Sequence, residues 1–131
     1  MIIGLIPSRL NSKRLKEKPL LKIDKLPIIV HSFKRSKLSK KLDDVIVCTD
    51  HKRIVNVIKK YGGKEEITTK KHKNGTERIY EVAKKLKNVE LIVDIQGDQP
   101  LINPTSIDKT IEFHQKNKNF DIVLASMLIS E

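Results

Sequence analysis

The chain begins with MIIGLIPSRLNSKRLKEKPLL (residues 1–21), in which an apolar run changes abruptly into a basic, polar segment. Residues 2–6 have the pattern of a short strand that is buried on both faces. The segment that follows contains one acid, Glu17, and five cations, Arg9, Lys13, Arg14, Lys16 and Lys18. Its composition alone fits a solvated basic loop and a phosphate-binding loop equally well.

The rest of the chain repeats this alternation of apolar strands and amphipathic helices. Strands are predicted at 45–49, 91–95 and 122–128, with a weaker one at 64–68. Helices are predicted at 27–38, 51–60, 74–86 and from 104 to about 116. Pro27 suits the first turn of the first helix. Three capping signals support the other helix starts: Asp50, the pair Asn74 and Glu77, and Asn103 before Pro104.

Short apolar strands that alternate with helices are typical of a parallel sheet with helices on both faces, so the 131 residues predict one α/β domain. In such sheets, ligands bind beyond the carboxyl ends of the strands. This rule selects the loops at 7–19, 49–51 and 96–103. The first loop is basic and the last contains a carboxylate, a combination that suits a nucleoside triphosphate with Mg²⁺.

The composition restricts the class of protein. A formal net charge of +11 favours polyanionic partners, but the cations are mostly lysines spread along the whole chain. Aromatic residues make up only 4%, which argues against a base-stacking nucleic-acid platform. The single cysteine, Cys48, lies in an apolar run and is expected to be a buried hydrophobic residue. Because the sequence contains no apolar run of membrane-spanning length and no signal-peptide pattern, we expect a cytoplasmic protein.

The segment QGDQP (96–100), in the last of these three loops, is a more specific signal than the basic loop at 7–19. Gly97 allows a sharp turn after the strand, and Asp98 then stands where one carboxylate can bind Mg²⁺ together with phosphates. A turn aspartate bonded to backbone amides explains the same residue equally well. Asp94, inside the preceding strand, needs a buried hydrogen-bond partner. The chain contains neither a P-loop nor a G-x-G-x-x-G motif.

Taken in order, four motifs resemble those of the 3-deoxy-manno-octulosonate (KDO) cytidylyltransferases, also called CMP-KDO synthetases. The family pattern I-P-A-R-x-x-S-x-R-L-P-G-K-P-L corresponds to IPSRLNSKRLKEKPL (6–20). A strand ending in A-T-D corresponds to VCTD (47–50), and H-x-S-G-T-E-R corresponds to HKNGTER (72–78). Finally, Q-G-D-E-P-L-I corresponds to QGDQPLI (96–102). The resemblance extends over essentially the whole chain.

The resemblance implies a Rossmann-like, three-layer α/β/α nucleotidyltransferase of the nucleotide-diphospho-sugar transferase type. Such an enzyme uses CTP and Mg²⁺ to convert KDO to CMP-KDO and pyrophosphate for lipopolysaccharide synthesis. By position, Asp98 is the implied Mg²⁺ ligand, and Arg9, Lys18 and Asp98 are the implied catalytic residues. The implied nucleotide contacts are Pro7, Arg9, Ser12, Arg14, Lys18, Arg78 and Gln96.

Two departures from the family pattern bear on activity. Glu17 replaces a glycine directly before the phosphate-binding lysine, and there it adds repulsion toward phosphate and removes a glycine's backbone freedom. The family is also about twice as long, and its second half provides sugar contacts, a dimer surface and a further metal-binding aspartate. We therefore expect residues 1–131 to be the CTP-binding N-terminal portion of a homodimeric enzyme, truncated or separated from its C-terminal half.

Three alternatives stay open on the sequence. One is a cytidylyltransferase for a related acidic sugar, such as 8-amino KDO or another nonulosonate. The second is a catalytically idle nucleotide-binding module, which Glu17 and the short chain favour. The third and least expected is a basic nucleic-acid binder, which would show steep salt dependence and no preference for one nucleotide base.

Overall fold

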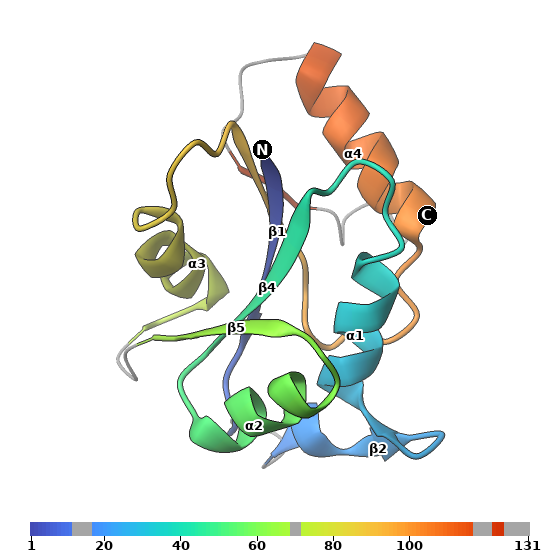
Figure 1. Ribbon diagram of the computed structural model, residues 1–131, viewed down its shortest axis with the longest axis vertical. Coiled ribbons are helices and arrows are strands. Elements are labelled where there is room, and N and C mark those ends of the chain that lie inside the picture. The colour runs from blue at the N-terminus through green and yellow to red at the C-terminus, as the bar shows by residue number, and fades with distance from the viewer. Residues whose placement is uncertain (12–16, 69–71, 117–121, 125–131) are drawn as a thin grey trace.

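The computed structural model describes residues 1–11, 17–68, 72–116 and 122–124, and Figure 1 shows a central sheet flanked by helices. The sheet contains β1 (Ile2–Ser8), β4 (Asp44–Thr49), β5 (Lys64–Ile67), β6 (Leu91–Asp94) and β7 (Ile122–Leu124). All neighbouring strands run parallel, in the order β5-β4-β1-β6-β7. The predicted α/β class with a parallel sheet is therefore confirmed.

The helices cover both faces of this sheet. On one face lie α1 (Ile28–Ser36), α2 (Lys52–Lys60) and α4 (Pro104–Lys116), and α3 (Gly75–Ala83) lies on the other. Alternate residues of each strand feed the two cores, since Ile2 and Ile6 pack with α1 while Ile3 and Leu5 pack with α3. The result is the expected three-layer α/β/α arrangement.

A small hairpin and a short turn of helix lie between β1 and α1. The hairpin consists of β2 (Lys22–Ile23) and β3 (Leu26–Pro27), which pair antiparallel. The single 3₁₀ turn, η1 (Lys18–Leu20), follows the segment 12–16, which lies outside the described residues. Lys18 lies near Pro7, Ser8 and Arg9, at the carboxyl end of β1.

The structure corrects several predicted element boundaries. The N-cap of α2 is His51, whose Nδ1 accepts a hydrogen bond from the Arg53 amide at 3.1 Å, and not Asp50. Pro27 is the N-cap of α1 and lies outside that helix, which ends at Ser36. Strand β1 continues to Ser8, two residues further than predicted. Residues 125–128 of the last predicted strand lie outside the described residues.

The strand order determines where a ligand site is expected. Strand β1 is central, with β4 and β5 on one side and β6 and β7 on the other. From β1 the chain adds β4 and β5 on one side, and it then returns to add β6 and β7 on the other side. The boundary between β1 and β6 is therefore the switch point of the sheet. In parallel sheets this switch point leaves a crevice at the carboxyl ends of the two strands, between their diverging loops. None of the helices among the described residues is long and apolar enough to cross a membrane.

Candidate nucleotide-binding site

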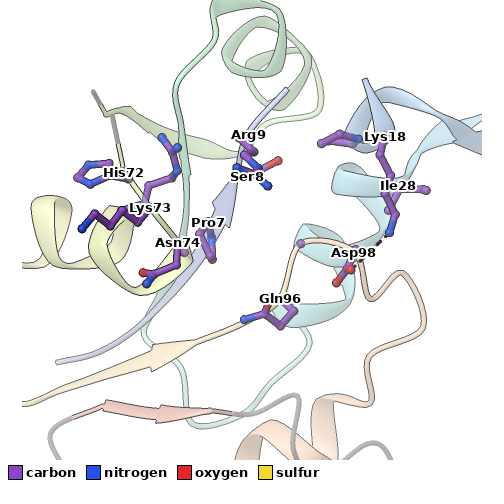
Figure 2. Close-up of a pocket in the computed structure, with 14 residues that line it drawn as sticks. Pro7, Ser8, Arg9, Lys18, Ile28, His72, Lys73, Asn74, Gln96 and Asp98 are labelled. Carbon is purple, nitrogen blue, oxygen red and sulfur yellow. Dashed lines mark ion pairs between the residues drawn. The ribbon is translucent and has the colours of Figure 1, made fainter. Parts of the chain in front are cut away.

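A cavity of about 680 Å³ lies at this switch point. Figure 2 shows the side chains around it, which come from the ends of β1 and β6, the start of α3 and the segment before α1. The residues that line it are Pro7, Ser8, Arg9, Lys18, Pro19, Ile28, His72, Lys73, Asn74, Gly75, Arg78, Gln96, Gly97 and Asp98. The cavity therefore unites three of the four segments that resemble family motifs.

The N-terminus of α3 forms one wall because it packs directly on the end of β1. Asn74 caps this helix as predicted, since its side-chain oxygen accepts a hydrogen bond from the Glu77 amide at 2.9 Å. The Glu77 carboxylate in turn accepts from the Lys73 amide at 2.8 Å. A methyl group added at Gly75 would lie 3.0 Å from Pro7 Cγ, so the first turn leaves little space for a side chain there.

Arg78 is a buried cation in this wall, with only 3% of its surface exposed. Its Nη1 donates a hydrogen bond to Thr68 Oγ1, and its Nη2 lies 3.8 Å from Asp50 Oδ2. Asp50 also accepts a hydrogen bond from the Leu10 amide at 3.4 Å. Arg78 thus connects α3 to the end of β4 and to the segment after β1.

The loop after β6 forms the opposite wall. Its backbone is held from behind, since Ser32 of α1 donates a hydrogen bond to the Gly97 carbonyl at 2.8 Å. A methyl group at Gly97 would lie 3.2 Å from the Pro7 carbonyl oxygen and 3.1 Å from Ile29 Cδ1. Because Gly97 has no side chain, the loop can lie against β1, with Gln96 and Asp98 at the cavity.

Asp94 lies behind Gln96 at the end of β6, with 2% of its surface exposed. The buried partner that the sequence required is Gln96, whose Nε2 donates to Asp94 Oδ1 at 3.2 Å. Burial raises the pKa of the Asp94 carboxyl to about 6 because the charged form is poorly solvated there. The carboxyl is consequently mostly ionised at neutral pH and becomes protonated in mild acid.

Two opposite charges stand at the outer end of the cavity. Lys18 Nζ lies 3.5 Å from Asp98 Oδ2, and their side chains are 42% and 53% exposed. The dashed line in Figure 2 marks this ion pair. In water such a pair is weak, so both side chains can turn toward an incoming ligand at little cost.

Glu17 does not face the cavity, contrary to the concern that the sequence raised. Its carboxylate forms an ion pair with Arg53 of α2, and it is not among the lining residues. Its backbone has a φ of 56°, the left-handed region that a glycine adopts more readily. The Glu17 charge is therefore paired with Arg53 outside the cavity, whereas the backbone cost expected from replacing a glycine remains.

The structure places six of the predicted site residues around the one cavity: Pro7, Arg9, Lys18, Arg78, Gln96 and Asp98. Ser12 and Arg14 lie outside the described residues. Eight other lining residues were not among the predicted site residues: Ser8, Pro19, Ile28, His72, Lys73, Asn74, Gly75 and Gly97. All of them except Ile28 lie within the motif segments. The roles assigned to the predicted residues stay predictions.

Ser8 is the most unusual of the missed residues. It is 6% exposed, and its Oγ is the one buried side-chain oxygen or nitrogen without a hydrogen-bond partner among the residues that the structure describes. A buried hydroxyl left in this state costs about 1–3 kcal/mol. No sequence pattern signals such a position, because it depends on what packs around it.

The side chains that line the cavity suit a metal ion held by one carboxylate and a ligand better than a metal ion held by protein side chains alone. Among the described residues, no group of three or more histidine, cysteine, aspartate or glutamate side chains forms a metal cage. Asp98 is the one carboxylate among the described lining residues. Mg²⁺ is commonly held by one or two carboxylates while substrate phosphates and water complete its coordination. The cavity therefore fits a Mg²⁺ ion that arrives with a phosphorylated ligand.

Comparison with known proteins identifies the family. Residues 3–128 match the family model described as cytidylyltransferase. The chain belongs to the cytidylyltransferase family. It is similar to a 3-deoxy-manno-octulosonate cytidylyltransferase of Fusobacterium nucleatum, at 42% identity over 95% of this chain and 50% of the relative. An 8-amino-3,8-dideoxy-manno-octulosonate cytidylyltransferase of Shewanella sp. (strain W3-18-1) is 40% identical over 88% of this chain and 48% of the relative.

A solved structure supports the same family. The fold is similar to that of a CMP:2-keto-3-deoxy-manno-octonic acid synthetase complexed with CTP. The match has a TM-score of 0.87 at 31% identity and covers 91% of this chain and 49% of the solved one. The resemblance inferred from the motifs is therefore confirmed. The chain spans about half the length of the curated relatives it matches.

Proposed function

We propose that this chain is the CTP-binding half of a cytidylyltransferase that activates KDO. In that reaction the anomeric hydroxyl oxygen of the sugar attacks the α-phosphorus of CTP, and the bond to pyrophosphate breaks. The products are CMP-KDO, which would serve lipopolysaccharide synthesis, and pyrophosphate. One observation supports the proposal most: residues from three separate motif segments line one cavity at the switch point of the sheet.

The inner part of the cavity suits the nucleoside. Pro7 and Gly75 provide a tightly packed apolar surface, and Arg78 and Gln96 provide polar atoms near it. Because Arg78 is already held by Thr68 and Asp50, its guanidinium is fixed before a ligand binds. Fixed polar groups recognise a ligand without the entropy cost of ordering them at that moment.

The outer part suits the triphosphate. Lys18 and Arg9 line it with positive charge. We propose that Ser12 and Arg14, which follow Arg9 in the same motif, make further phosphate contacts. Phosphoryl transfer depends mainly on positioning and on neutralising the charge of the phosphate oxygens, and these cations would provide both.

Asp98 would hold the Mg²⁺ that accompanies CTP. When bound, the ion would neutralise negative charge on the phosphates. Lys18, which now pairs with Asp98, would be released to bind a phosphate oxygen. Because the Lys18–Asp98 pair is exposed and weak, its separation would cost little when the two side chains bind a phosphate and the metal ion.

The choice of sugar is a separate question. Relatives named for KDO and for its 8-amino form match this chain about equally well, at 42% and 40% identity. We propose KDO as the substrate and the 8-amino sugar as the alternative. We propose that residues 1–131 alone bind the nucleotide. We assign turnover to the complete, homodimeric enzyme. We infer that the enzyme is located in the cytoplasm.

Titration of the purified chain with CTP, ATP and a short DNA duplex, each with and without Mg²⁺, tests the proposal. We expect CTP to bind more tightly than ATP and to bind more tightly when Mg²⁺ is present. Asp98→Asn should remove the Mg²⁺ effect. Asp24→Asn is a matched control at an exposed position outside the cavity, and it should keep the effect.

Other results would point to other functions. Duplex binding without a preference for CTP would refute the proposal in favour of the nucleic-acid binder. Selective CTP binding by a full-length protein that releases no pyrophosphate when KDO or its 8-amino form is added would favour the idle nucleotide-binding module. Comparing the two sugars in the pyrophosphate assay identifies the substrate.

A further inference from the structure

The pairing of Asp94 with Gln96 has a consequence for ligand recognition. A glutamine side chain ends in an oxygen that accepts hydrogen bonds and a nitrogen that donates them, and the two point in different directions. An ionised carboxylate can only accept. Because Asp94 Oδ1 lies 3.2 Å from the Gln96 terminus, it is the nitrogen, Nε2, that must face Asp94.

This arrangement leaves the Gln96 oxygen for the ligand. Gln96 is half-buried and lines the cavity, whereas Asp94 is buried behind it. Within the described part of the chain, Gln96 Oε1 accepts no hydrogen bond from the protein. The Gln96 oxygen therefore faces the cavity as a hydrogen-bond acceptor, and the buried Asp94 carboxylate sets its orientation.

We propose that Asp94 is a positioning residue that fixes the carboxamide of Gln96 so that its oxygen faces the bound nucleotide. The proposal rests on the nucleotide-binding function inferred above. It assigns specificity to a residue that does not itself line the cavity. The recognised group is a hydrogen-bond donor, with two possible sources on CTP: the exocyclic amine of cytosine and the 2′-hydroxyl of the ribose.

The buried charge has an evident cost that an uncharged residue would avoid. Ionised Asp94 lies in a poorly solvated place, whereas an asparagine would fill nearly the same volume and still pair with Gln96. An asparagine at position 94, however, can turn either its oxygen or its nitrogen toward Gln96. The Gln96 carboxamide could then pair through its nitrogen or through its oxygen. A carboxylate is the side chain that removes this ambiguity.

Binding of three nucleotides tests the proposal and separates the two sources. The chain is titrated calorimetrically with CTP, UTP and 2′-deoxy-CTP in Mg²⁺ at neutral pH. UTP replaces the amine with a carbonyl oxygen, and 2′-deoxy-CTP lacks one hydroxyl. Wild type should prefer CTP over the nucleotide that lacks the recognised donor.

In Asp94→Asn this preference should fall about fivefold, the effect of one hydrogen bond. The double variant Asp94→Asn with Gln96→Glu exchanges the carboxylate and the amide. It again presents only an oxygen to the cavity, so the preference should return to within about twofold of wild type. Asp98→Asn is the matched control, because it should weaken all three nucleotides alike and leave the ratios unchanged.

A merely structural role for Asp94 would change all affinities together and would not be reversed by the exchange. The proposal is overturned if Asp94→Asn keeps both wild-type ratios, if wild type shows no preference in either comparison, or if the exchange does not restore the preference. A chain that binds none of the nucleotides refutes the proposed function itself. CTP binding with unchanged ratios refutes only the role of Asp94.

Discussion

The inner and outer ends of the cavity are built in different ways. At the inner end, Arg78 and Asp94 are 3% and 2% exposed and have protein partners before any ligand binds. At the outer end, Lys18 and Asp98 are about half exposed and pair with each other across 3.5 Å. Substitutions at the inner end should therefore have their largest effect on folding stability, whereas those at the outer end should mainly change ligand affinity.

The largest expected effect is at the inner end. Arg78→Ala leaves the partly buried carboxylate of Asp50 without its cation and Thr68 without its donor. Removing one partner of a buried ion pair costs about 3–5 kcal/mol, and we expect the lower value because Asp50 is not fully buried. Urea denaturation measures this loss. Arg53→Ala, which removes an exposed cation, is the control and should cost under about 0.5 kcal/mol. Equal losses would contradict the comparison.

Asp94→Asn should raise stability at neutral pH. The folded-state pKa is about 6 and the ordinary value is 3.8, so the folded chain binds more protons between these values. The contribution of Asp94 to stability is thus fully present below about pH 4 and is lost as the pH rises through 6. Two units correspond to about 3 kcal/mol, reduced to about 2 by the weaker hydrogen bond of asparagine. The unfolding free energies of both proteins are measured at pH 4, 5, 6 and 7. The advantage of Asp94→Asn over wild type should grow as the pH rises, and a constant difference would refute the burial effect.

At the outer end, Lys18→Met should weaken CTP binding about tenfold, since a hydrogen bond to a charged group is worth about 1.5 kcal/mol. Its effect on stability should stay within about 0.5 kcal/mol, because the Lys18–Asp98 pair is exposed. Lys52→Met, at an exposed position outside the cavity, is the control for the change in net charge. A larger loss of stability than of affinity would reverse the contrast between the two ends.

Ser8→Ala should stabilise the chain by about 1 kcal/mol, because it removes a buried hydroxyl without a partner among the described residues. Ser36→Ala is the matched opposite, since Ser36 is fully buried and donates to the Ser32 carbonyl at 2.7 Å. It should lose about 1 kcal/mol. Thermal and urea unfolding of both variants measure whether each change raises or lowers the free energy of unfolding. A lower value for Ser8→Ala would reveal that the Ser8 hydroxyl has an internal hydrogen-bond partner.

The sequence was sufficient wherever neighbouring residues determine the structure. The apolar runs predicted β1, β4, β6 and β7, and the spacing of Asn74 and Glu77 predicted the start of α3, where the capping bond is formed. It failed where tertiary contacts choose between similar residues. Asp50 and His51 can both cap α2, but the Asp50 carboxylate is already bonded to Leu10 and faces Arg78. His51 therefore caps the helix.

The same limit applies to the site. The motif spacing identified six lining residues, because each motif ends a strand or begins a helix at the same edge of the sheet. It could not show that Arg78 is buried, that Asp94 pairs with Gln96, or that the Glu17 carboxylate is directed to Arg53. Each of these depends on a residue that is distant in sequence or on local packing that no motif encodes.

Glu17 gives the smallest expected effect and tests whether the outer end tolerates a charge near the phosphates. Glu17→Gly should stabilise the chain by about 0.5–1 kcal/mol, because the φ of 56° suits glycine while an exposed ion pair with Arg53 is lost. Glu17→Ala loses the same ion pair but keeps a Cβ, so it should not stabilise. CTP affinity should change less than about twofold in either variant, since charges that are paired and exposed interact weakly with a ligand. Tighter CTP binding in both variants would mean that the Glu17 carboxylate does repel phosphate. The outer end would then be limited by repulsion from its own chain as well as by the weakness of exposed pairs.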